Sequence, residues 1–153
     1  MPVRSDSEIM EYIENSMLRI EPFSADSLGP AGYDLRAGSN ISIPPAGCVL
    51  VHTLEFVELG SMVCGDLFLR SSFAREGIIG SFALVDPGFR GQLTLSLTNM
   101  GQGAVDIAEG ERLAQIVFLK LDRPPKKIYS GRYQNSKGAV ASKRGFKQTY
   151  KLK

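Results

Sequence analysis

The feature that most constrains this chain is its division into short β-favouring runs separated by glycine and proline. Sixteen glycines and eight prolines punctuate the 153 residues. Many short strands with turn residues between them, and no helices alternating with them, predict an all-β barrel or sandwich. The predicted strand-forming runs are 40–43, 48–56, 65–69, 80–85, 92–98, 105–107 and 113–121.

One sizeable helix is predicted near the N-terminus, over residues 5–18. Ser5 or Asp6 can cap it, and apolar residues from Ile9 onward fall roughly on one stripe. The length of the chain predicts a single domain with a proper hydrophobic core. An all-β domain preceded by one short helix is therefore the expected architecture.

The run Gln92–Thr98 can be interpreted residue by residue. Side chains alternate between the two faces of a strand, so Leu93, Leu95 and Leu97 share one face and must point to a core. The opposite face is polar but uncharged, and Ser96 lies at its middle.

Composition excludes several classes of protein. With 43% hydrophobic and 22% charged residues, the chain is typical of globular proteins. No apolar run approaches the roughly 20 residues that a membrane helix needs, and no basic segment followed by an apolar one marks a leader. We therefore expect a cytoplasmic protein without membrane contact. Cys48 and Cys64 match no metal-ligand spacing and are predicted to be buried free thiols.

Charge is divided unevenly along the chain. Residues 1–119 hold 15 acidic and 7 basic residues, whereas residues 120–153 hold 11 basic residues and one acid, Asp122. An acidic body is thus followed by a strongly basic tail. Such a tail either binds an anion or is simply solvated, and charge alone favours neither interpretation.

Two stretches place charged residues among glycines and strand residues. In 31–37, Asp34 and Arg36 alternate with Tyr and Leu and so project from one strand face, as a structural ion pair or as metal or phosphate contacts. In 70–77, two serines between arginines follow a strand and open a short helix. They predict an anion site or, equally well, a simple helix cap.

Two further stretches carry polar groups at exceptional positions. In 83–91, a Pro-Gly pair predicts a tight turn between strands, with Asp86 just before it. Asp86 either stabilises the turn or, at the mouth of a hairpin, accepts a proton from water. In 110–118, Gln115 is an amide within an apolar run and needs partners, from the backbone or from a ligand.

In their order and spacing these stretches resemble the dUTPase and dCTP deaminase superfamily of trimeric β proteins. The resemblance runs from the N-terminal helix and Ile20–Ser24 to Tyr133–Ser142 and covers nearly the whole chain. It implies a distorted jelly-roll-like β-barrel over residues 1–130 with one short N-terminal helix. It also implies a flexible basic C-terminal arm, 131–153, that closes over the active site, and a homotrimer with active sites at subunit interfaces.

The residues of several of these motifs are similar to those of the deaminase branch, or of the archaeal-type dUTPases related to it. The deaminases use a glutamate in a Thr-Leu-Glu-like context, where this chain has Thr94-Leu95-Ser96. A serine hydroxyl cannot replace a carboxylate as a general base at neutral pH. Asp86, in contrast, matches the aspartate that activates water in the dUTPases. The resemblance therefore implies hydrolysis of dUTP to dUMP and pyrophosphate.

The resemblance also implies a role for each site residue. Asp86 would be the general base, Phe89 would pack on the deoxyribose, and Asp34 would contact, through water, a Mg²⁺ ion held chiefly by the three phosphates. Phe146 would be a lid over the base. The other implied substrate-binding residues are Arg70, Ser71, Ser72, Arg75, Gln115 (from an adjacent subunit), Tyr133, Gln134, Lys143 and Arg144.

Two alternatives stay open at this stage. One is a dCTP deaminase, or a bifunctional deaminase and diphosphatase, in which another group replaces the glutamate. The other is a non-catalytic nucleotide-binding regulator. A zinc deaminase is excluded because His52 is the sole histidine and no Cys-x-x-Cys occurs. A nucleic-acid partner is not expected, because the basic residues are confined to the tail and lack an interleaved stacking platform.

Overall fold

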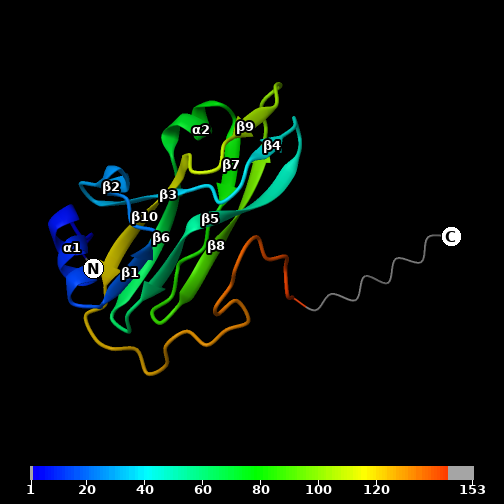
Figure 1. Ribbon diagram of the computed structural model, residues 1–153. Helices are drawn as coiled ribbons and strands as arrows, with labels where there is room; N and C mark the ends of the chain where they lie inside the picture. Colours follow the sequence, from blue (N-terminus) through cyan, green and yellow to red (C-terminus); the bar gives the residue numbers. More distant parts are fainter. Residues whose placement is uncertain (1, 145–153) are drawn as a thin grey trace.

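The computed structural model describes residues 2–144 and confirms the predicted all-β, jelly-roll-like barrel with one main helix (Figure 1). Two four-stranded antiparallel sheets, ordered β1-β5-β8-β7 and β2-β3-β10-β6, are joined by the small pair β4-β9. The elements are α1 (Asp6–Glu14), β1 (Leu18–Glu21), the 3-10 turn η1 (Ala25–Ser27), β2 (Leu28–Gly29), β3 (Gly32–Arg36), β4 (Ile41–Ile43), β5 (Cys48–Leu59), β6 (Val63–Leu69), α2 (Ser71–Arg75), β7 (Ile78–Ser81), β8 (Arg90–Asn99), β9 (Val105–Ile107) and β10 (Arg112–Lys120).

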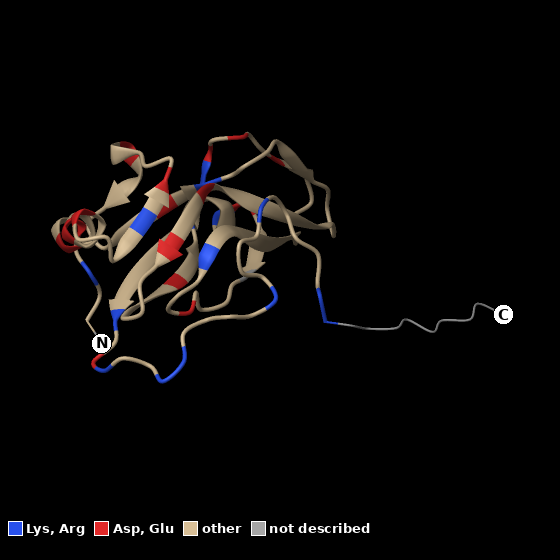
Figure 2. Ribbon diagram, turned by 60° about the horizontal axis from the view of Figure 1, so that its bottom comes forward, with Lys and Arg blue, Asp and Glu red and all other residues tan. Residues whose placement is uncertain are grey.

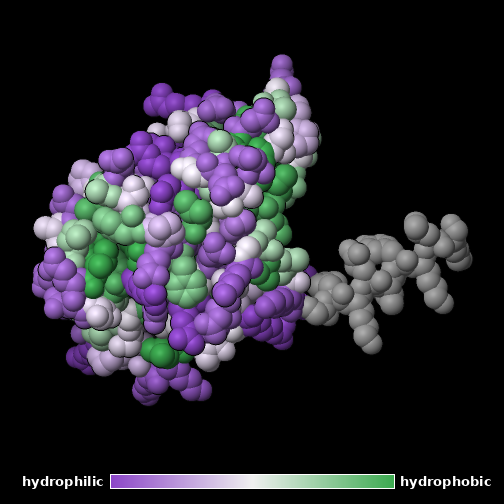
Figure 3. Space-filling model, viewed as in Figure 1, coloured by the Kyte–Doolittle hydropathy of each residue, from purple (hydrophilic) through white to green (hydrophobic). Residues whose placement is uncertain are grey.

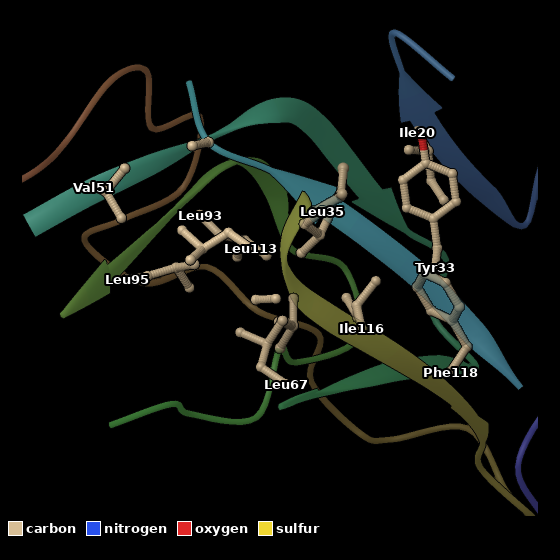
Figure 4. Close-up of a cluster of buried hydrophobic side chains, with 14 of the residues drawn as sticks. Ile20, Tyr33, Leu35, Val51, Leu67, Leu93, Leu95, Leu113, Ile116 and Phe118 are labelled. Atoms are coloured by element: carbon tan, nitrogen blue, oxygen red, sulfur yellow. The ribbon is translucent and has the colours of Figure 1, made fainter. Parts of the chain in front are cut away.

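The core lies between the two four-stranded sheets. Along β8 the three leucines at 93, 95 and 97 are buried while the residues between them are half-buried, which confirms the predicted faces of this strand. Figure 4 shows Leu93 and Leu95 of β8 in one buried cluster with Leu113 and Ile116 of β10. Removal of this apolar surface from water is the main favourable contribution to folding.

Helix α1 begins as predicted but ends four residues early. Ser5 caps it, accepting a hydrogen bond from the Glu8 N–H, while the Glu8 carboxylate accepts the Ser5 N–H at 3.0 Å. The chain leaves the helix through Ser16, which has a positive φ of 57°. Leu18 then opens β1, a short strand paired with the end of β5 that the sequence pattern did not indicate.

The predicted strand 80–85 is wrong at both ends. Strand β7 runs from Ile78 to Ser81, and residues 82–89 form a connection to β8. The reason is that Val85 leaves the sheet of β7 and exchanges two backbone hydrogen bonds with Gly65 of β6, at 2.7 and 2.9 Å. Asp86 therefore lies in a connection that crosses between the two sheets, and not at the mouth of a simple hairpin.

A buried ion pair ties the two sheets together. The Glu55 side chain is fully buried, and its two carboxylate oxygens accept the backbone N–H of Arg36 at 2.8 Å and its Nε at 2.6 Å. Arg36 also donates from Nη2 to the Pro22 carbonyl oxygen at 2.7 Å. Glu55 belongs to β5 and Arg36 to β3, so one carboxylate links strands of different sheets.

No helix within residues 2–144 is long and apolar enough to cross a membrane.

We expect Arg36→Met to reduce the free energy of unfolding by about 3 kcal/mol, because it leaves the Glu55 charge buried without its partner. Urea denaturation followed by circular dichroism measures the loss. The control is Arg19→Met, since the Arg19–Glu21 pair is exposed and should matter far less. Equal losses in the two variants would contradict a structural role for the buried pair.

Candidate functional site

The structure gathers Asp34, Arg70 and Arg112 at one end of the sheet β2-β3-β10-β6. The Asp34 carboxylate lies 3.2 Å from Nε of Arg70 and 3.8 Å from Nη1 of Arg112. Arg36, on the same strand as Asp34, does not pair with it, because Glu55 engages Arg36 instead. We call Asp34, Arg70 and Arg112 the arginine cluster. Arg112 was not among the residues singled out from the sequence, although it lies in the stretch 110–118.

Gln115 extends the arginine cluster along β10. It is in register with Asp34 on β3, so the two side chains share a face. Gly32 leaves space for the Gln115 side chain, because a Cβ added at position 32 would lie only 3.1 Å from Cγ of Gln115. Among the described residues its amide makes no hydrogen bond. The polar group that the sequence marked as needing partners is thus available to a ligand.

The two serines of α2 do not act as helix caps. Arg70 occupies the N-cap position and its side chain makes no capping hydrogen bond. Ser71 and Ser72 are exposed, and within residues 2–144 their hydroxyl groups have no hydrogen-bond partner. Arg75 is exposed in the last turn of the same helix. The interpretation of Ser71 and Ser72 as a simple helix cap is therefore wrong.

Asp86 opens a tight turn whose centre is Pro87 and Gly88, as predicted. The Phe89 N–H donates to the Asp86 carbonyl oxygen at 3.1 Å, and Gly88 has a φ of 83°, which favours glycine. Asp86 is exposed and lines a cavity of about 420 Å³. The walls of this cavity are mostly apolar, with Lys127 as the second charged group. A carboxylate at the rim of a pocket of this size is typical of small-molecule sites.

The residues after β10 hold the Asp86 turn in place. Tyr129 donates its N–H to the Pro87 carbonyl at 2.8 Å, and its ring packs edge-on against Phe89 with the centroids 5.6 Å apart. Gln134 donates from Nε2 to the Gly88 carbonyl at 2.8 Å and accepts the N–H of Arg90 at 3.0 Å. Phe89 is buried beneath Tyr129 in its own chain. Tyr129 is a second residue that sequence reasoning missed.

The described part of the C-terminal segment, 131–144, lies along the polar face of β8. Gln92 donates its N–H to Ser136, while Gly138 donates to the Gln92 side chain. A Cβ on Gly91 would come within 2.9 Å of the Ser136 nitrogen, so glycine permits this close approach.

Two of the predicted substrate-binding residues in the segment 131–144 contact one another. Tyr133 accepts the Lys143 N–H on its hydroxyl at 2.9 Å, and Nζ of Lys143 lies 5.5 Å from the centre of the tyrosine ring. Nζ of Lys143 also donates to the Arg132 carbonyl at 2.8 Å. Arg144 donates its N–H to the Ser142 hydroxyl. Phe146 lies outside the described residues.

Ser96 lies on the outer face of β8 beside Cys48 of β5, with Oγ and Sγ 3.5 Å apart. The hydrogen bond with Ser96, and a second one with Thr98, lower the pKa of the Cys48 thiol. On this face, in the strands β5 and β8, the nearest acid is Glu58, which is opposite Arg90 and about 20 Å along the strand from Ser96. No carboxylate on these strands takes the place of a deaminase glutamate.

The prediction of two buried thiols is wrong for Cys48, which is exposed at the start of β5. Cys64 is buried as predicted, and burial raises the pKa of its thiol. Both cysteines are free.

The arginine cluster and Asp86 lie at opposite ends of β6. Asp86 shares its cavity with Cys64, near the start of β6, whereas Arg70 follows the end of that strand. Arg70 is six positions beyond Cys64 along the strand, which is about 20 Å. Figure 2 shows acidic and basic residues interleaved on the strands and basic residues spread over the chain that follows β10. Within one chain, the predicted site residues thus form two groups.

The fold is that of the dUTPases and dCTP deaminases. It superposes on the dCTP deaminase from Agrobacterium tumefaciens with a TM-score of 0.66, at 19% identity, over 76% of this chain and 47% of that one. It also superposes on the native EIAV dUTPase with a TM-score of 0.59, at 22% identity, over 76% of this chain and 98% of that one.

The amino-acid sequence identifies the family within this fold. The dCTP deaminase-like family matches residues 37–121. The chain is 50% identical to the dCTP deaminase of Pyrococcus horikoshii, over 82% of this chain and 90% of that protein. It is 33% identical to the dUMP-forming dCTP deaminase of Aquifex aeolicus (92% and 94% covered) and to a probable deoxyuridine 5'-triphosphate nucleotidohydrolase of Sulfolobus islandicus rod-shaped virus 1 (92% and 98%). The chain therefore belongs to the dCTP deaminase-like family.

We expect Cys48 to react with iodoacetamide much faster than Cys64 in the folded protein, because it is exposed and its pKa is lowered. In Ser96→Ala the loss of a hydrogen bond to the thiolate should move the pH midpoint of Cys48 alkylation upward and slow the reaction at neutral pH. Mass spectrometry of the adducts across pH measures the midpoint. The control is Ser71→Ala, because Ser71 lies on α2 and is far from Cys48 in the sequence. An unchanged midpoint in Ser96→Ala would contradict the contact.

Proposed function

We propose that the protein is a dUTP diphosphatase that hydrolyses dUTP to dUMP and pyrophosphate. The observation that carries the proposal is the difference between two positions. Asp86 presents an exposed carboxylate at a cavity, whereas the middle of the polar face of β8 holds the hydroxyl of Ser96. A carboxylate can take a proton from an attacking water at neutral pH, and a serine hydroxyl cannot.

In the proposed reaction Asp86 accepts a proton from water as the water oxygen forms a bond to the α-phosphorus of dUTP. The bond between that phosphorus and the bridging oxygen to the β-phosphate breaks, and pyrophosphate leaves with the bonding electron pair. Reactions of this kind depend mainly on positioning and on neutralising charge. The guanidinium groups of Arg70 and Arg112 and the hydroxyl groups of Ser71 and Ser72 are available for the phosphates.

The connection 82–89 is the proposed base-recognition segment. Its turn is fixed by Gln134 and Tyr129, so the remaining main-chain donors and acceptors are held in place before a ligand arrives. Uracil and cytosine exchange donor and acceptor at ring position 4, and a wrong base leaves buried polar groups unpaired, at a cost of about 1–3 kcal/mol for each group. A fixed main chain can therefore select one pyrimidine.

Magnesium is assigned to the substrate complex and not to a protein cage. Within residues 2–144 no group of three or more His, Cys, Asp or Glu side chains could hold a metal ion. The Asp34 carboxylate is engaged by two arginines. These side chains do not fit a protein-held ion, whereas three phosphates readily bind Mg²⁺. No step of the proposed reaction is assigned to the metal.

Assembly of several copies would bring the two groups of site residues together. Asp86 and the arginine cluster lie at opposite ends of β6 in one chain, so we propose a homotrimer in which neighbouring subunits share each site. Exposed apolar side chains support contact between copies: Phe68, Ile79 and Leu84 are each about half exposed. Figure 3 shows apolar patches between polar residues on one face of the molecule.

A second candidate, dCTP deamination, is favoured by the names of the relatives. The P. horikoshii protein, at 50% identity, is called a dCTP deaminase, and the A. aeolicus protein is called dUMP-forming. A bifunctional enzyme would combine both reactions. The absence of an acid near Ser96 on strands β5 and β8 is the reason for placing this candidate second.

With dUTP and magnesium we expect the wild type to release pyrophosphate, and Asp86→Asn to lose about a hundredfold or more in kcat, because the general base is removed. Ion chromatography measures pyrophosphate, and retention of dUTP by Asp86→Asn in calorimetry shows that binding survives. Asp106→Asn, an exposed acid on β9, is the control.

The same assay run with dCTP, dTTP and UTP separates the candidates. We expect no ammonia from dCTP. Ammonia release together with dUMP would establish the bifunctional enzyme, and ammonia with dUTP accumulating would establish the deaminase. An inert wild type that still binds dUTP would support the regulator.

Shared sites predict complementation between two inactive variants. Asp86→Asn and Arg70→Gln should each be inactive alone. When they are mixed and allowed to exchange subunits, random assembly restores intact pairs at about a quarter of the sites, and so about a quarter of the wild-type rate. Size-exclusion chromatography with light scattering confirms that the mixture is trimeric. A rate no higher than the sum of the separate variants would show that one chain supplies both groups.

A further inference from the structure

The arrangement of charge in the arginine cluster is unusual for an ordinary surface ion pair. One carboxylate, that of Asp34, faces two guanidinium groups, and the side chain of Asp34 is only 17% exposed. The side chains of Arg70 and Arg112 are 33% and 45% exposed, so both reach solvent. The cluster therefore carries one positive charge in excess, and it is open to an anion.

Other charged groups near the arginine cluster do not cancel this excess. Arg36 is opposite Arg112 in the β3-β10 register, but its charge is matched by Glu55. Asp26 contacts Arg112 through its backbone carbonyl. Among the described residues, Asp34 is the one acid that forms an ion pair with either Arg70 or Arg112.

Each arginine also has an anchor that does not involve Asp34. Arg70 donates from Nη1 to the Arg112 carbonyl oxygen at 3.2 Å. Arg112 donates from Nη1 to the Asp26 carbonyl oxygen at 2.9 Å. Because these acceptors belong to the main chain, each guanidinium group keeps one hydrogen bond when the negative charge of Asp34 is removed. The negative charge of Asp34 can thus be separated experimentally from the geometry of the cluster.

We propose that Asp34 is an internal counter-ion that occupies the place of a phosphate group, and that Arg112 is a phosphate-binding residue beside Arg70. Two guanidinium groups this close repel one another, and the carboxylate offsets that repulsion before substrate arrives. An incoming phosphate must compete with Asp34 for the same donors. Asp34 in this role is a positioning residue that weakens binding of anions with low charge and leaves the highly charged triphosphate able to compete.

This inference rests on the proposed function only for the identity of the anion as a nucleoside triphosphate. Its test uses inorganic tripolyphosphate, which carries the phosphates without the nucleoside. Isothermal titration calorimetry at low ionic strength gives the dissociation constant for the wild type, Asp34→Asn, Arg112→Gln and the control Glu21→Gln. Glu21 belongs to an exposed ion pair on β1, in the other sheet. Asp34→Asn keeps the shape of the side chain and removes its charge.

We expect Asp34→Asn to bind tripolyphosphate about five- to tenfold more tightly than the wild type, with the gain shrinking at high salt because the effect is electrostatic. Arg112→Gln should bind about tenfold more weakly, and Glu21→Gln should not differ from the wild type. A purely structural role for Asp34 would not tighten binding.

Equal or weaker binding by Asp34→Asn overturns the counter-ion role, and unchanged binding by Arg112→Gln overturns its assignment as a ligand. Thermal melting shows which variants fold. If Asp34→Asn does not fold, the effect of the Asp34 charge is taken from the comparison of Arg112→Gln with the double variant Asp34→Asn, Arg112→Gln. The dUTP assay is independent of these results. Tripolyphosphate binding that responds as expected in a protein inert toward dUTP would refute the diphosphatase and leave this inference standing.

Discussion

The position of β10 between β3 and β6 is the constraint on which the rest of the site depends. Antiparallel pairing on both sides of β10 sets Gln115 opposite Asp34 and brings the start of β10 next to the residue that follows β6. Residues far apart in the sequence thus meet with their charged groups within 4 Å. A change of register by one residue would turn Gln115 into the core and break the arginine cluster.

The second group of site residues depends on a different kind of interaction. The turn that carries Asp86 is held to its own sheet by two backbone hydrogen bonds with Leu59 of β5, at 2.9 and 3.0 Å, and the preceding residue, Val85, pairs with β6. Side chains and main chain of the residues that follow β10 supply further support. Tyr129 and Gln134 donate to the carbonyl groups of Pro87 and Gly88, so chain that follows the barrel contributes to the order of the turn.

The sequence predicted the fold class well, and it predicted the stretches that carry polar groups. Alternation in 92–98 is visible because a strand with one buried face repeats every two residues. Partners were harder to predict, because ion pairing depends on which strands become neighbours. Asp34 and Arg36 are two residues apart on one strand, yet they do not pair with each other. Asp34 pairs with two arginines from outside β3, and Arg36 pairs with Glu55 of β5. The exposure of Cys48 and the path of residues 82–89 likewise depend on which strands become neighbours. The roles implied by the resemblance, from Asp86 to Arg144, stay predictions.

Gly91 has a consequence for how this protein can vary. The backbone of the C-terminal segment lies so close to Gly91 that a methyl group there would meet the Ser136 nitrogen at 2.9 Å. The segment is attached through its own peptide groups, which donate to Gln92 and Thr94, and through the side chain of Gln134. Side chains of the segment that make no contacts of their own, unlike that of Gln134, are therefore open to mutational drift, whereas position 91 tolerates no larger residue. Among homologues that keep this attachment, diversity should accumulate at those positions of the segment and be excluded from position 91 beneath it.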